Sequence, residues 1–367
     1  MRIIISGGGS GGHIYPAIAI ADALQHHDPN SELLFVGAQG KMEMQRVPAA
    51  GYPIVGLSIR GVQRKQVWQN LSVPFRVMDS LWKAKRLIKH FRPDVVVGTG
   101  GYASAPILYA ATHMKLPTLV QEQNAHAGLT NRLLAERLDK VCVAYNHMDR
   151  YFPADKIVLT GNPVRQDIIN LGEKQQAAYD YFGLVPDKPC LLVLGGSLGA
   201  KTINESILQA LTQLLEAGIQ VIWPTGHFYF EDIQAQLTEQ QRAAVKLYPF
   251  MESMDLAYAA ADIVVSRAGA LAIAELCIVN KPTIFIPSPN VVADHQTKNV
   301  WPLVAQGAAI LIQDKEARQK LSQAIIQLLQ DEDRQKTLVQ NMRHWAKPRA
   351  TADIVTLIHE LANGSRS

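Results

Sequence analysis

Short apolar runs alternate with longer segments of helical periodicity along the chain. Within each short run nearly every position is apolar, which is typical of parallel strands covered on both faces of a sheet. The first series of predicted strands comprises Arg2–Ser6, Leu33–Gly37, Val95–Gly98, Thr118–Gln121 and Lys140–Ala144. The second series comprises Leu191–Gly195, Gln220–Pro224, Ile263–Ser266, Thr283–Pro287 and Ala309–Ile312. The pattern predicts the α/β fold class, with parallel sheets covered by helices.

The two series form a loose internal repeat. Each opens with an apolar strand that runs into a glycine-rich turn, at Ile3–Gly9 and again at Leu191–Ser197. Because this arrangement is typical of Rossmann-like domains, we expect two of them, over residues 1–163 and 164–344, facing each other across a cleft. Ligands are expected at the carboxyl ends of the strands, where such sheets bind nucleotides.

A linker and a final helix complete the expected organisation. Gly161–Pro163, followed by the polar stretch Glu173–Gln176, is a plausible linker. The last helical pattern covers about residues 345–367 and is expected to join the first domain. Pro348 lies inside this pattern, and we expect a kink there because proline lacks the backbone N–H that a helix interior requires.

Composition agrees with two buried cores. Hydrophobic residues make up 48% of the 367 positions, charged residues make up 19%, and the net charge is only +4. Cys142, Cys190 and Cys277 lie far apart inside apolar runs, so we expect buried thiols rather than disulfides or metal ligands. No apolar run has the length of a signal peptide or of a membrane span, which favours a protein of the reducing cell interior.

The first glycine-rich turn formally matches a dinucleotide-binding signature. Five of the six residues from Gly7 to Gly12 are glycine, and His13 follows them. A dehydrogenase also needs an acidic residue at the end of the second strand to hold the ribose, whereas that strand ends in Gly37. We therefore favour a loop whose bare backbone and helix N-terminus admit an anionic ligand over a nicotinamide or flavin site.

Two further glycine loops follow predicted strands. Gly195–Ala200 leads into a helical pattern and suits a diphosphate, and Gly98–Tyr102 follows an apolar strand. Metal-dependent sugar transfer usually uses an Asp-x-Asp motif after a strand. The one match, Asp331–Asp333, follows a helical pattern and is interpreted as solvated surface, so neither a metal nor another cofactor is predicted.

With these loops in hand, the sequence resembles the MurG family of glycosyltransferases, which have the GT-B fold. The resemblance runs almost end to end and rests on Gly7–Pro16, Gly98–Tyr102, Glu122–Asn124, Gly128–Asn131, Gly161–Arg165, Gly195–Ala200, Ser266–Ala270, Glu275 and Asp294–Gln296. It implies a UDP-GlcNAc donor and the lipid acceptor undecaprenyl-pyrophosphoryl-MurNAc-pentapeptide, lipid I. The implied reaction inverts the anomeric centre: GlcNAc moves to the 4-hydroxyl of MurNAc and gives lipid II for peptidoglycan synthesis.

The resemblance also implies roles in donor binding. Glu275 would hold the ribose hydroxyls, Ser197 and Arg165 the diphosphate, Gln296 the sugar, and the Met251 backbone the uracil. The full implied set is Ser10, Gly11, Gly12, Asn124, Arg165, Gly196, Ser197, Met251, Ala270, Leu271, Glu275 and Gln296. The alternative for Glu275 is a solvated helix residue. Leu198, Lys201 and Ala272 differ from residues of some relatives, so contacts from those side chains are not carried over.

Three residues are candidates for the catalytic machinery. His13 is the first choice for the general base, because an imidazole titrates near operating pH. The alternative is that His13 orients the loop or binds the acceptor phosphates. Glu122 is the reserve base, and Asn124 is expected to shape the acceptor pocket with it, whereas His126 is expected to be peripheral.

A basic amphipathic segment over residues 73–92 is the candidate membrane surface. We expect Phe75, Met78 and Trp82 to lie beside a basic face that includes Lys85 and Lys89, as in helices that bind anionic lipid. The alternative is an ordinary amphipathic helix with a solvated basic side. The lipid-linked acceptor implied by the resemblance favours peripheral attachment to the cytoplasmic face of the membrane. No recognition motif supports nucleic-acid binding.

Other functions of the same fold stay open at the level of sequence. A UDP-GlcNAc 2-epimerase or a glycolipid glycosyltransferase would share the donor-binding loops. A non-catalytic nucleotide-sugar-binding scaffold would keep Glu275 and could lose His13 without consequence.

Overall fold

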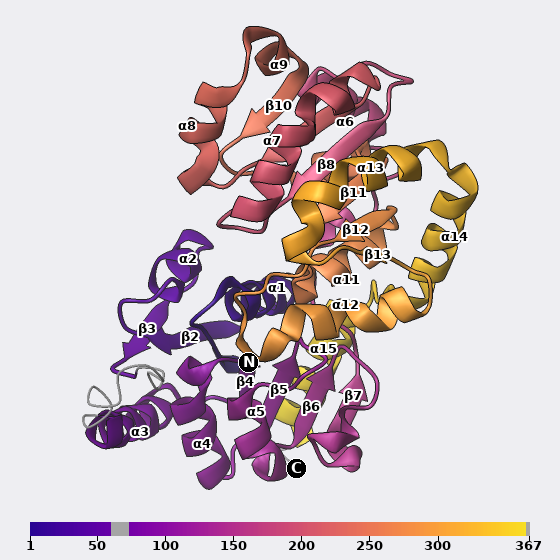
Figure 1. Cartoon of the computed structure of the whole chain (residues 1–367). Helices are drawn as coiled ribbons and strands as arrows, with labels where there is room; N and C mark the ends of the chain where they lie inside the picture. Colours follow the sequence, from indigo (N-terminus) through magenta and orange to yellow (C-terminus); the bar gives the residue numbers. More distant parts are fainter. Residues whose placement is uncertain (60–72, 365–367) are drawn as a thin grey trace. The chain divides into compact units, whose positions relative to one another are not determined.

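The structure is a computed structural model that describes residues 1–59 and 73–364, with side chains from residue 77 in the second range (Figure 1). The chain forms two compact units. Unit 1 comprises Met1–Val164 and Arg349–Ser367, and unit 2 comprises Arg165–Pro348. Each unit contains one wholly parallel sheet with helices packed on it, as the α/β pattern predicts.

Unit 1 is built on a seven-stranded sheet of order β3-β2-β1-β4-β5-β6-β7. The strands are β1 (Arg2–Gly7), β2 (Glu32–Ala38), β3 (Ile54–Leu57), β4 (Val95–Gly100), β5 (Thr118–Glu122), β6 (Lys140–Val143) and β7 (Ile157–Leu159). In the register, Ile5 of β1 pairs with Phe35 on one side and with Val97 on the other. The strand order reverses between β1 and β4, and the loops that diverge at such a point leave a crevice for ligands.

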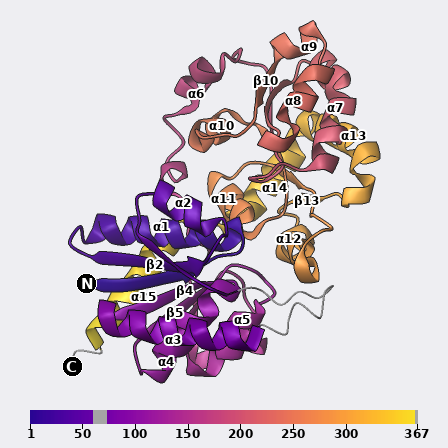
Figure 2. The same cartoon turned by 90° about the vertical axis from the view of Figure 1, so that its left-hand side faces the viewer.

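Helices cover both faces of this sheet (Figure 2). They are α1 (Gly11–His27), α2 (Glu43–Ala49), α3 (Val73–Phe91), α4 (Ala105–His113), α5 (Leu129–Leu134) and α15 (Ala350–Gly364). Successive side chains of a strand point to opposite faces. Ile3 and Ile5 therefore join the core under α1 and α15, whereas Ile4 joins the core under α3 and α4. The continuous apolar run of β1 is the consequence of burial on both sides.

Pro348 lies between two elements rather than inside one kinked helix, so the prediction of a kink was wrong. A short 3-10 turn ends at Trp345, and α15 begins at Ala350. A proline at the end of a non-helical connection loses no helical hydrogen bond, which makes this position less costly than a helix interior. Thr351, in the first turn of α15, donates to the carbonyl of Val164 at 3.3 Å.

Unit 2 contains a six-stranded sheet of order β10-β9-β8-β11-β12-β13. The strands are β8 (Cys190–Leu194), β9 (Gln220–Pro224), β10 (Val245–Tyr248), β11 (Ile263–Ser266), β12 (Thr283–Phe285) and β13 (Ile310–Leu311). The helices are α6 (Gln175–Phe182), α7 (Lys201–Glu216), α8 (His227–Gln236), α9 (Glu239–Ala244), α10 (Met254–Ala260), α11 (Ala270–Val279), α12 (His295–Ala305), α13 (Ala317–Gln330) and α14 (Glu332–Met342).

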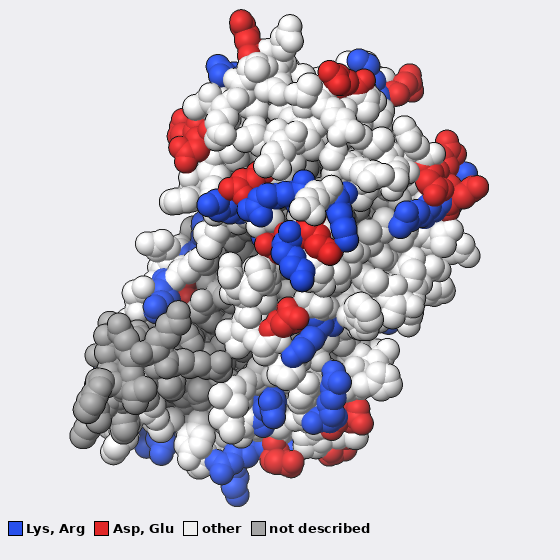
Figure 3. Space-filling model, viewed as in Figure 1, with Lys and Arg blue, Asp and Glu red and all other residues white. Residues whose placement is uncertain are grey.

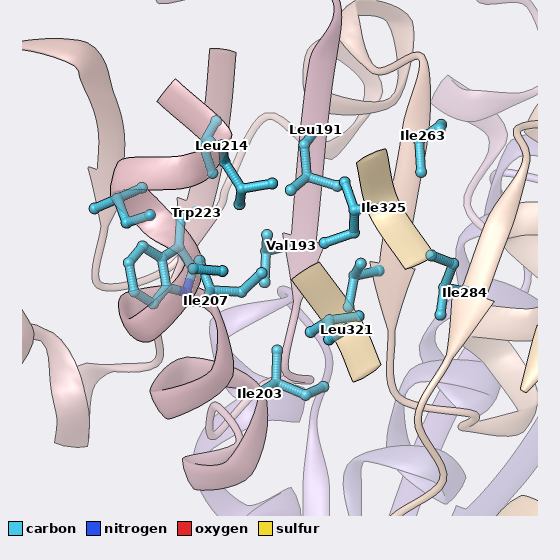
Figure 4. Packing of buried hydrophobic residues seen from close by; sticks show 14 of the residues in the cluster. Leu191, Val193, Ile203, Ile207, Leu214, Trp223, Ile263, Ile284, Leu321 and Ile325 are labelled. Atoms are coloured by element: carbon cyan, nitrogen blue, oxygen red, sulfur yellow. The ribbon is translucent and has the colours of Figure 1, made fainter. Parts of the chain in front are cut away.

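The main core of unit 2 lies between β8 and the helices α7 and α13 (Figure 4). Val193 of β8, Ile207 of α7 and Leu321 of α13 are all fully buried there. The same core contains Trp223, whose indole N–H donates to the Asn204 side chain at 3.0 Å. A buried indole N–H needs such a partner, because an unpaired one would carry a desolvation penalty.

The strand predictions were confirmed for the interior of both sheets and for the edge strand β13. Each predicted strand corresponds to an observed one, and three observed strands, β3, β7 and β10, were missed. All three lie at sheet edges and are only partly buried. β3 and β7 are apolar runs of only 4 and 3 residues, and β10 contains Lys246, so none of them gives the longer apolar run on which the prediction depends.

The cysteines are buried and unbonded, as predicted. Burial raises the pKa of Cys142, Cys190 and Cys277 to about 12, so each is a protonated thiol at neutral pH. Because the thiolate is the reactive form, these residues behave as small apolar core side chains. Over the described part of the chain, no helix combines the length and the apolar character needed to cross a membrane.

Candidate functional site

The first glycine loop connects β1 to α1, and its glycines are needed for packing. Ser10 has extended backbone angles and immediately precedes the helix at Gly11. A Cβ atom on Gly7 would lie 1.9 Å from Oγ1 of Thr99, and one on Gly8 would lie 2.2 Å from Oε1 of Glu43. Close packing within unit 1 therefore accounts for these two glycines, while Ser10 and Gly12 are exposed to solvent.

Glu43 anchors this loop and was not predicted from the sequence. Its side chain is fully buried, and its carboxylate accepts from the backbone N–H of Gly9 at 3.1 Å and of Ala38 at 3.0 Å. Hydrogen bonds to an ionised group are among the stronger ones in proteins. Glu43 thus fixes the glycine loop to the end of β2. An acidic residue shortly after a buried strand is the sequence signal that could have identified it.

His13 lies in the first turn of α1 with a defined ring orientation. Its Nδ1 is 3.1 Å from the carbonyl oxygen of Gly8 and 3.1 Å from Oγ of Ser10. Because a carbonyl can only accept, Nδ1 carries the proton in a neutral ring, which makes Nε2 the basic nitrogen. Oγ1 of Thr99 donates to the His13 carbonyl at 2.7 Å and ties the helix start to β4.

The third glycine loop packs against the first one and against His13. Gly100 and Gly101 have φ angles of +93° and +80°, which side chains rarely adopt. A Cβ atom on Gly101 would lie 2.2 Å from the Gly8 carbonyl oxygen, and one on Gly100 would lie 3.0 Å from the His13 ring. The conformation of this loop therefore permits the observed place of the imidazole.

Glu122 organises the loop that follows β5. One carboxylate oxygen accepts from the backbone and side-chain amides of Asn124 at 3.1 and 3.3 Å. The other accepts from the backbone N–H of Gly128 and the side chain of Asn131, both at 2.9 Å. Since N–H donors occupy both oxygens of this buried carboxylate, the geometry favours a positioning role for Glu122 over proton abstraction. His126 contacts Tyr151, with Nδ1 2.7 Å from the phenol oxygen.

In unit 2, the loop from Gly195 to Ala200 joins β8 to α7. Gly199 has a φ angle of +78°, and a Cβ atom there would lie 2.0 Å from the Thr225 carbonyl oxygen. Gly196 differs, because a Cβ atom on it would meet open space. Gly196 and Ser197 are exposed, and no side-chain hydrogen bond caps the start of α7 within the described residues. Backbone N–H groups at a helix start favour an anionic ligand.

A largely buried ion pair contacts the first turn of α7, which follows this loop. Nη1 of Arg267 contacts Oδ1 of Asp314 and donates to the carbonyl oxygen of Ile286 at 3.0 Å. The other carboxylate oxygen of Asp314 accepts from Oγ1 of Thr202, in the first turn of α7, at 2.9 Å. Arg267 and Asp314 thus connect the ends of β11 and β12 to the start of α7. Neither residue was assigned a role from the sequence.

Glu275 is a largely buried carboxylate on α11, so the alternative of a solvated helix residue was wrong. Its side chain is 16% exposed; Oε2 accepts from the Tyr258 hydroxyl at 2.9 Å and Oε1 lies 3.4 Å from Nε of Arg165. Burial raises the pKa of Glu275 above its usual 4.5, although Arg165 and Tyr258 oppose the shift. Ala270 and Leu271 form the first turn of the same helix. Sequence reasoning missed Tyr258.

The remaining donor-site candidates in unit 2 have defined positions. Oε1 of Gln296, at the start of α12, accepts from the Ser288 backbone N–H at 2.7 Å. Met251 is buried and follows Phe250, whose ring is parallel to that of His227 at 6.1 Å between centroids. Because all strands of the sheet are parallel, the segments after β8, β10, β11 and β12 emerge at the same edge. Ser10, Gly11, Gly12 and Asn124 belong to unit 1.

The exposed face of α3 has the composition predicted for a membrane surface. Ala84 and Ile88 are buried, whereas Met78 is 70% and Trp82 is 60% exposed. The Arg86 guanidinium lies 5.5 Å from the Trp82 ring centroid. Two further predicted basic residues, Lys85 and Lys89, are exposed. The Phe75 side chain lies outside those described.

Basic and acidic side chains are mixed on one face of the molecule (Figure 3), and the three residues of the Asp-x-Asp match are exposed to solvent, as predicted. Figure 3 shows basic and acidic side chains interspersed on the face of the molecule that it presents. Asp331 accepts from the Arg334 backbone N–H at 2.9 Å and caps α14. No cluster of three or more potential metal-binding side chains occurs among the residues with described positions.

The fold and these loops define a two-domain nucleotide-sugar glycosyltransferase architecture, and comparison with known proteins gives its family. The glycosyltransferase family 28 N-terminal domain matches residues 3–143, and the family 28 C-terminal domain matches residues 190–354. The chain belongs to glycosyltransferase family 28.

Individual relatives are similar over their whole length. The chain is 54% identical over 363 residues to the UDP-N-acetylglucosamine--N-acetylmuramyl-(pentapeptide) pyrophosphoryl-undecaprenol N-acetylglucosamine transferase of Amoebophilus asiaticus, covering 98% of this chain and 100% of that protein. It is 52% identical over 365 residues to the enzyme of the same name from Cytophaga hutchinsonii, covering 100% and 98%.

Solved structures agree with the fold. The crystal structure of Acinetobacter baumannii MurG matches with a TM-score of 0.76 and 30% identity, covering 98% of this chain and 99% of that one. A UDP-GlcNAc 2-epimerase from Neisseria meningitidis matches with a TM-score of 0.67 at 17% identity, covering 98% of this chain and 100% of that one, which is a likeness of fold alone.

Replacing Glu275 by Gln is expected to stabilise the protein at about pH 7, because the folded state disfavours the ionised side chain. A carboxyl group whose pKa is raised on folding lowers stability above that pKa and has no such effect below 4.5, where folded and unfolded chains are both protonated. The advantage of Glu275→Gln should therefore shrink as the pH falls toward 4.5. Thermal unfolding of both proteins over this pH range measures the difference in stability between Glu275→Gln and the parent protein.

Glu205→Gln is a matched control, because Glu205 forms an exposed ion pair with Arg318 on the surface of the same unit. This control is expected to change the unfolding temperature little. If Glu275→Gln proved less stable than the parent protein near neutral pH, the assigned environment of Glu275 would be incorrect.

Proposed function

We propose that this chain transfers GlcNAc from UDP-GlcNAc to the 4-hydroxyl of MurNAc in lipid I, with inversion at the anomeric carbon, releasing UDP and forming lipid II for peptidoglycan synthesis. The structural observation that carries the proposal is the largely buried Glu275 carboxylate, at the strand edge where the uncapped start of α7 also lies. Sequence identities of 54% and 52% to transferases of this name, over nearly the full length of each chain, support the choice of donor and acceptor.

The proposed donor site lies at the carboxyl edge of the unit 2 sheet. Glu275 holds the two ribose hydroxyls, since one carboxylate can accept from both. Gly196, Ser197 and the first N–H groups of α7 hold the diphosphate, and Arg165 adds positive charge. The backbone of Met251 forms hydrogen bonds with the uracil, and Gln296 binds the hydroxyls of GlcNAc. Ala270 and Leu271 line the site at the start of α11. Ser10, Gly11, Gly12 and Asn124, which belong to unit 1, are further candidates for donor contacts.

In the proposed mechanism, His13 is the general base. Its Nε2 accepts the proton of the acceptor 4-hydroxyl, because the Gly8 carbonyl keeps the other ring nitrogen protonated. The acceptor oxygen forms a bond to C1 of GlcNAc while the bond from C1 to the phosphate oxygen breaks. Negative charge then develops on UDP, and Arg165 with the α7 N–H groups stabilises it without a bound metal. Glu122 and Asn124 keep the loop after β5 in place and shape the pocket for the acceptor.

We further propose that α3 attaches the enzyme to the cytoplasmic face of the membrane, where a lipid-linked acceptor would be presented. Exposed Met78 and Trp82 would enter the interface between lipid head groups and acyl chains. Lys85, Lys89 and Arg86 would contact anionic lipid head groups, with each basic residue contributing about 1 kcal/mol near such a surface.

Incubation with radiolabelled UDP-GlcNAc and a short-chain lipid I analogue is expected to yield a labelled disaccharide lipid and UDP. Chromatography of the lipid fraction measures the product, and a reaction without acceptor is the control. Conversion of UDP-GlcNAc in that control, with no label in the lipid, would instead indicate an epimerase.

His13→Ala is expected to lower kcat by about a hundredfold or more, because general-base catalysis contributes on this scale. UDP binding measured by calorimetry should remain unchanged, since the residues proposed to contact the ribose and the diphosphate of UDP lie in unit 2. His126→Ala is the matched control and should retain near-normal turnover. A near-normal kcat for His13→Ala would remove the assignment of the base.

Trp82→Glu is expected to weaken binding to phosphatidylglycerol-containing vesicles by about tenfold or more, because it replaces an apolar interfacial side chain by a charge that anionic lipid repels. Sedimentation with vesicles measures the binding. Trp301→Glu is the matched control, since Trp301 on α12 is equally exposed, at 60%. An equal loss in both variants would contradict a specific role for α3.

A further inference from the structure

The two oxygens of the Glu275 carboxylate have different partners. Oε2 accepts from the hydroxyl of Tyr258, a side chain that is only 1% exposed. Oε1 lies 3.4 Å from Nε of Arg165, whose side chain is 41% exposed. One oxygen is thus held from the interior of unit 2 and the other from its solvent side.

A framework holds the segments that carry these partners. Lys174 forms an ion pair with Asp255 of α10 at 2.7 Å, and the same ammonium donates to the Asp167 carbonyl at 2.9 Å. Tyr258 lies on α10, and Arg165 immediately precedes the 3-10 turn that contains Asp167. Lys174 therefore ties the two segments together, while the side chain of Arg165 is 41% exposed.

The Arg165 contact is suited to exchange. A half-exposed ion pair contributes little free energy, because solvent screens the charges and the long side chain loses freedom. Ribose hydroxyls can replace the guanidinium, since they offer O–H donors to the same carboxylate oxygen. The displaced guanidinium can then contact another anion. A nucleoside diphosphate supplies one, whereas a nucleoside does not.

We propose that the Arg165–Glu275 ion pair is a latch that makes the donor site select nucleoside diphosphates over nucleosides, with Tyr258 as the positioning residue that holds Glu275 during the exchange. The inference rests on the donor site assigned above. The ribose takes Oε1 as Arg165 moves to the diphosphate, so the two parts of the ligand are recognised together. A ligand without phosphates breaks the ion pair but offers Arg165 no replacement anion. Such a ligand therefore binds with lower affinity.

The nearby charge adds to this selection. The carboxylate of Asp167 acts on Glu275 in the direction that raises its pKa, as a neighbouring negative charge does. Without Arg165, the two carboxylates would repel an incoming diphosphate but would have little effect on an uncharged nucleoside. The same guanidinium therefore favours UDP and opposes uridine.

Calorimetric titration with uridine and with UDP tests the latch. Arg165→Ala is expected to weaken UDP binding by about tenfold or more, through loss of a charge-assisted contact, and to strengthen uridine binding by about threefold, through loss of the competing ion pair. Arg318→Ala, which removes an exposed ion pair with Glu205 that has no part in the proposed donor site, should change neither affinity. Equal weakening of both ligands by Arg165→Ala would overturn the latch.

Tyr258→Phe tests the positioning role separately. It is expected to weaken uridine and UDP by the same factor, about fivefold, because the lost hydrogen bond orients the carboxylate that both ligands share. The acidic limb of the pH profile of KM for UDP-GlcNAc should also move to higher pH, since the Tyr258 hydrogen bond lowers the pKa of Glu275. If Tyr258→Phe folds and the acidic limb of its KM profile does not move, the positioning role of Tyr258 is overturned. The Arg165→Ala result stands alone if Tyr258→Phe does not fold.

Glu275→Ala separates failure of the latch from failure of the donor site. Unchanged UDP binding by Glu275→Ala would refute the donor site, and the latch with it. Loss of UDP binding by Glu275→Ala, together with equal effects of Arg165→Ala on uridine and UDP, would refute the latch alone.

Discussion

Carboxylates that accept hydrogen bonds from backbone and side-chain donors hold the loops at the strand ends, and the arrangement of both candidate sites depends on them. In unit 1, Glu43 fixes the glycine loop and Glu122 fixes the loop after β5. In unit 2, Asp314 joins Arg267 to the first turn of α7. Glycine-rich backbone has high conformational entropy in the unfolded chain, so it adopts one structure only where strong contacts oppose that entropy. Charge-assisted hydrogen bonds supply those contacts.

The glycines of these loops serve two distinct purposes. Gly8 and Gly101 are required because a Cβ atom on either would overlap a neighbouring atom of the folded unit. Gly196 has open space around it and a φ angle of +88°, so its surroundings do not exclude a side chain, although its backbone conformation disfavours one. A glycine that packing does not require, on an exposed loop at a helix start, is the better indicator of ligand approach. The sequence alone cannot separate these two classes.

Structural elements could be predicted from the sequence where a single local pattern of residues identifies them. Interior strands such as β1 could be recognised, because burial on both faces makes every position apolar, whereas the partly exposed edge strand β10 could not. Glu275 was assigned through resemblance to a family. Tyr258 was not, because it precedes Glu275 by 17 residues and lies in an apolar helical pattern where a tyrosine is unremarkable core. Its hydroxyl acquires a role only when α10 and α11 are placed together.

Glu275 differs from the loop-anchoring carboxylates in how completely it is satisfied. Glu122 accepts from four N–H groups, whereas Glu275 has one tyrosine hydroxyl and one half-exposed guanidinium. Full satisfaction makes a buried carboxylate a fixed structural element, since any exchange would leave donors unpaired. Burial raises the pKa of Glu275, and its single half-exposed cationic partner leaves one oxygen open to exchange. A ligand hydroxyl can improve the environment of Glu275 but could only disrupt that of Glu122. If the proposed donor site is correct, partial burial with a replaceable partner is the physical property that distinguishes Glu275 from the structural carboxylate of Glu122.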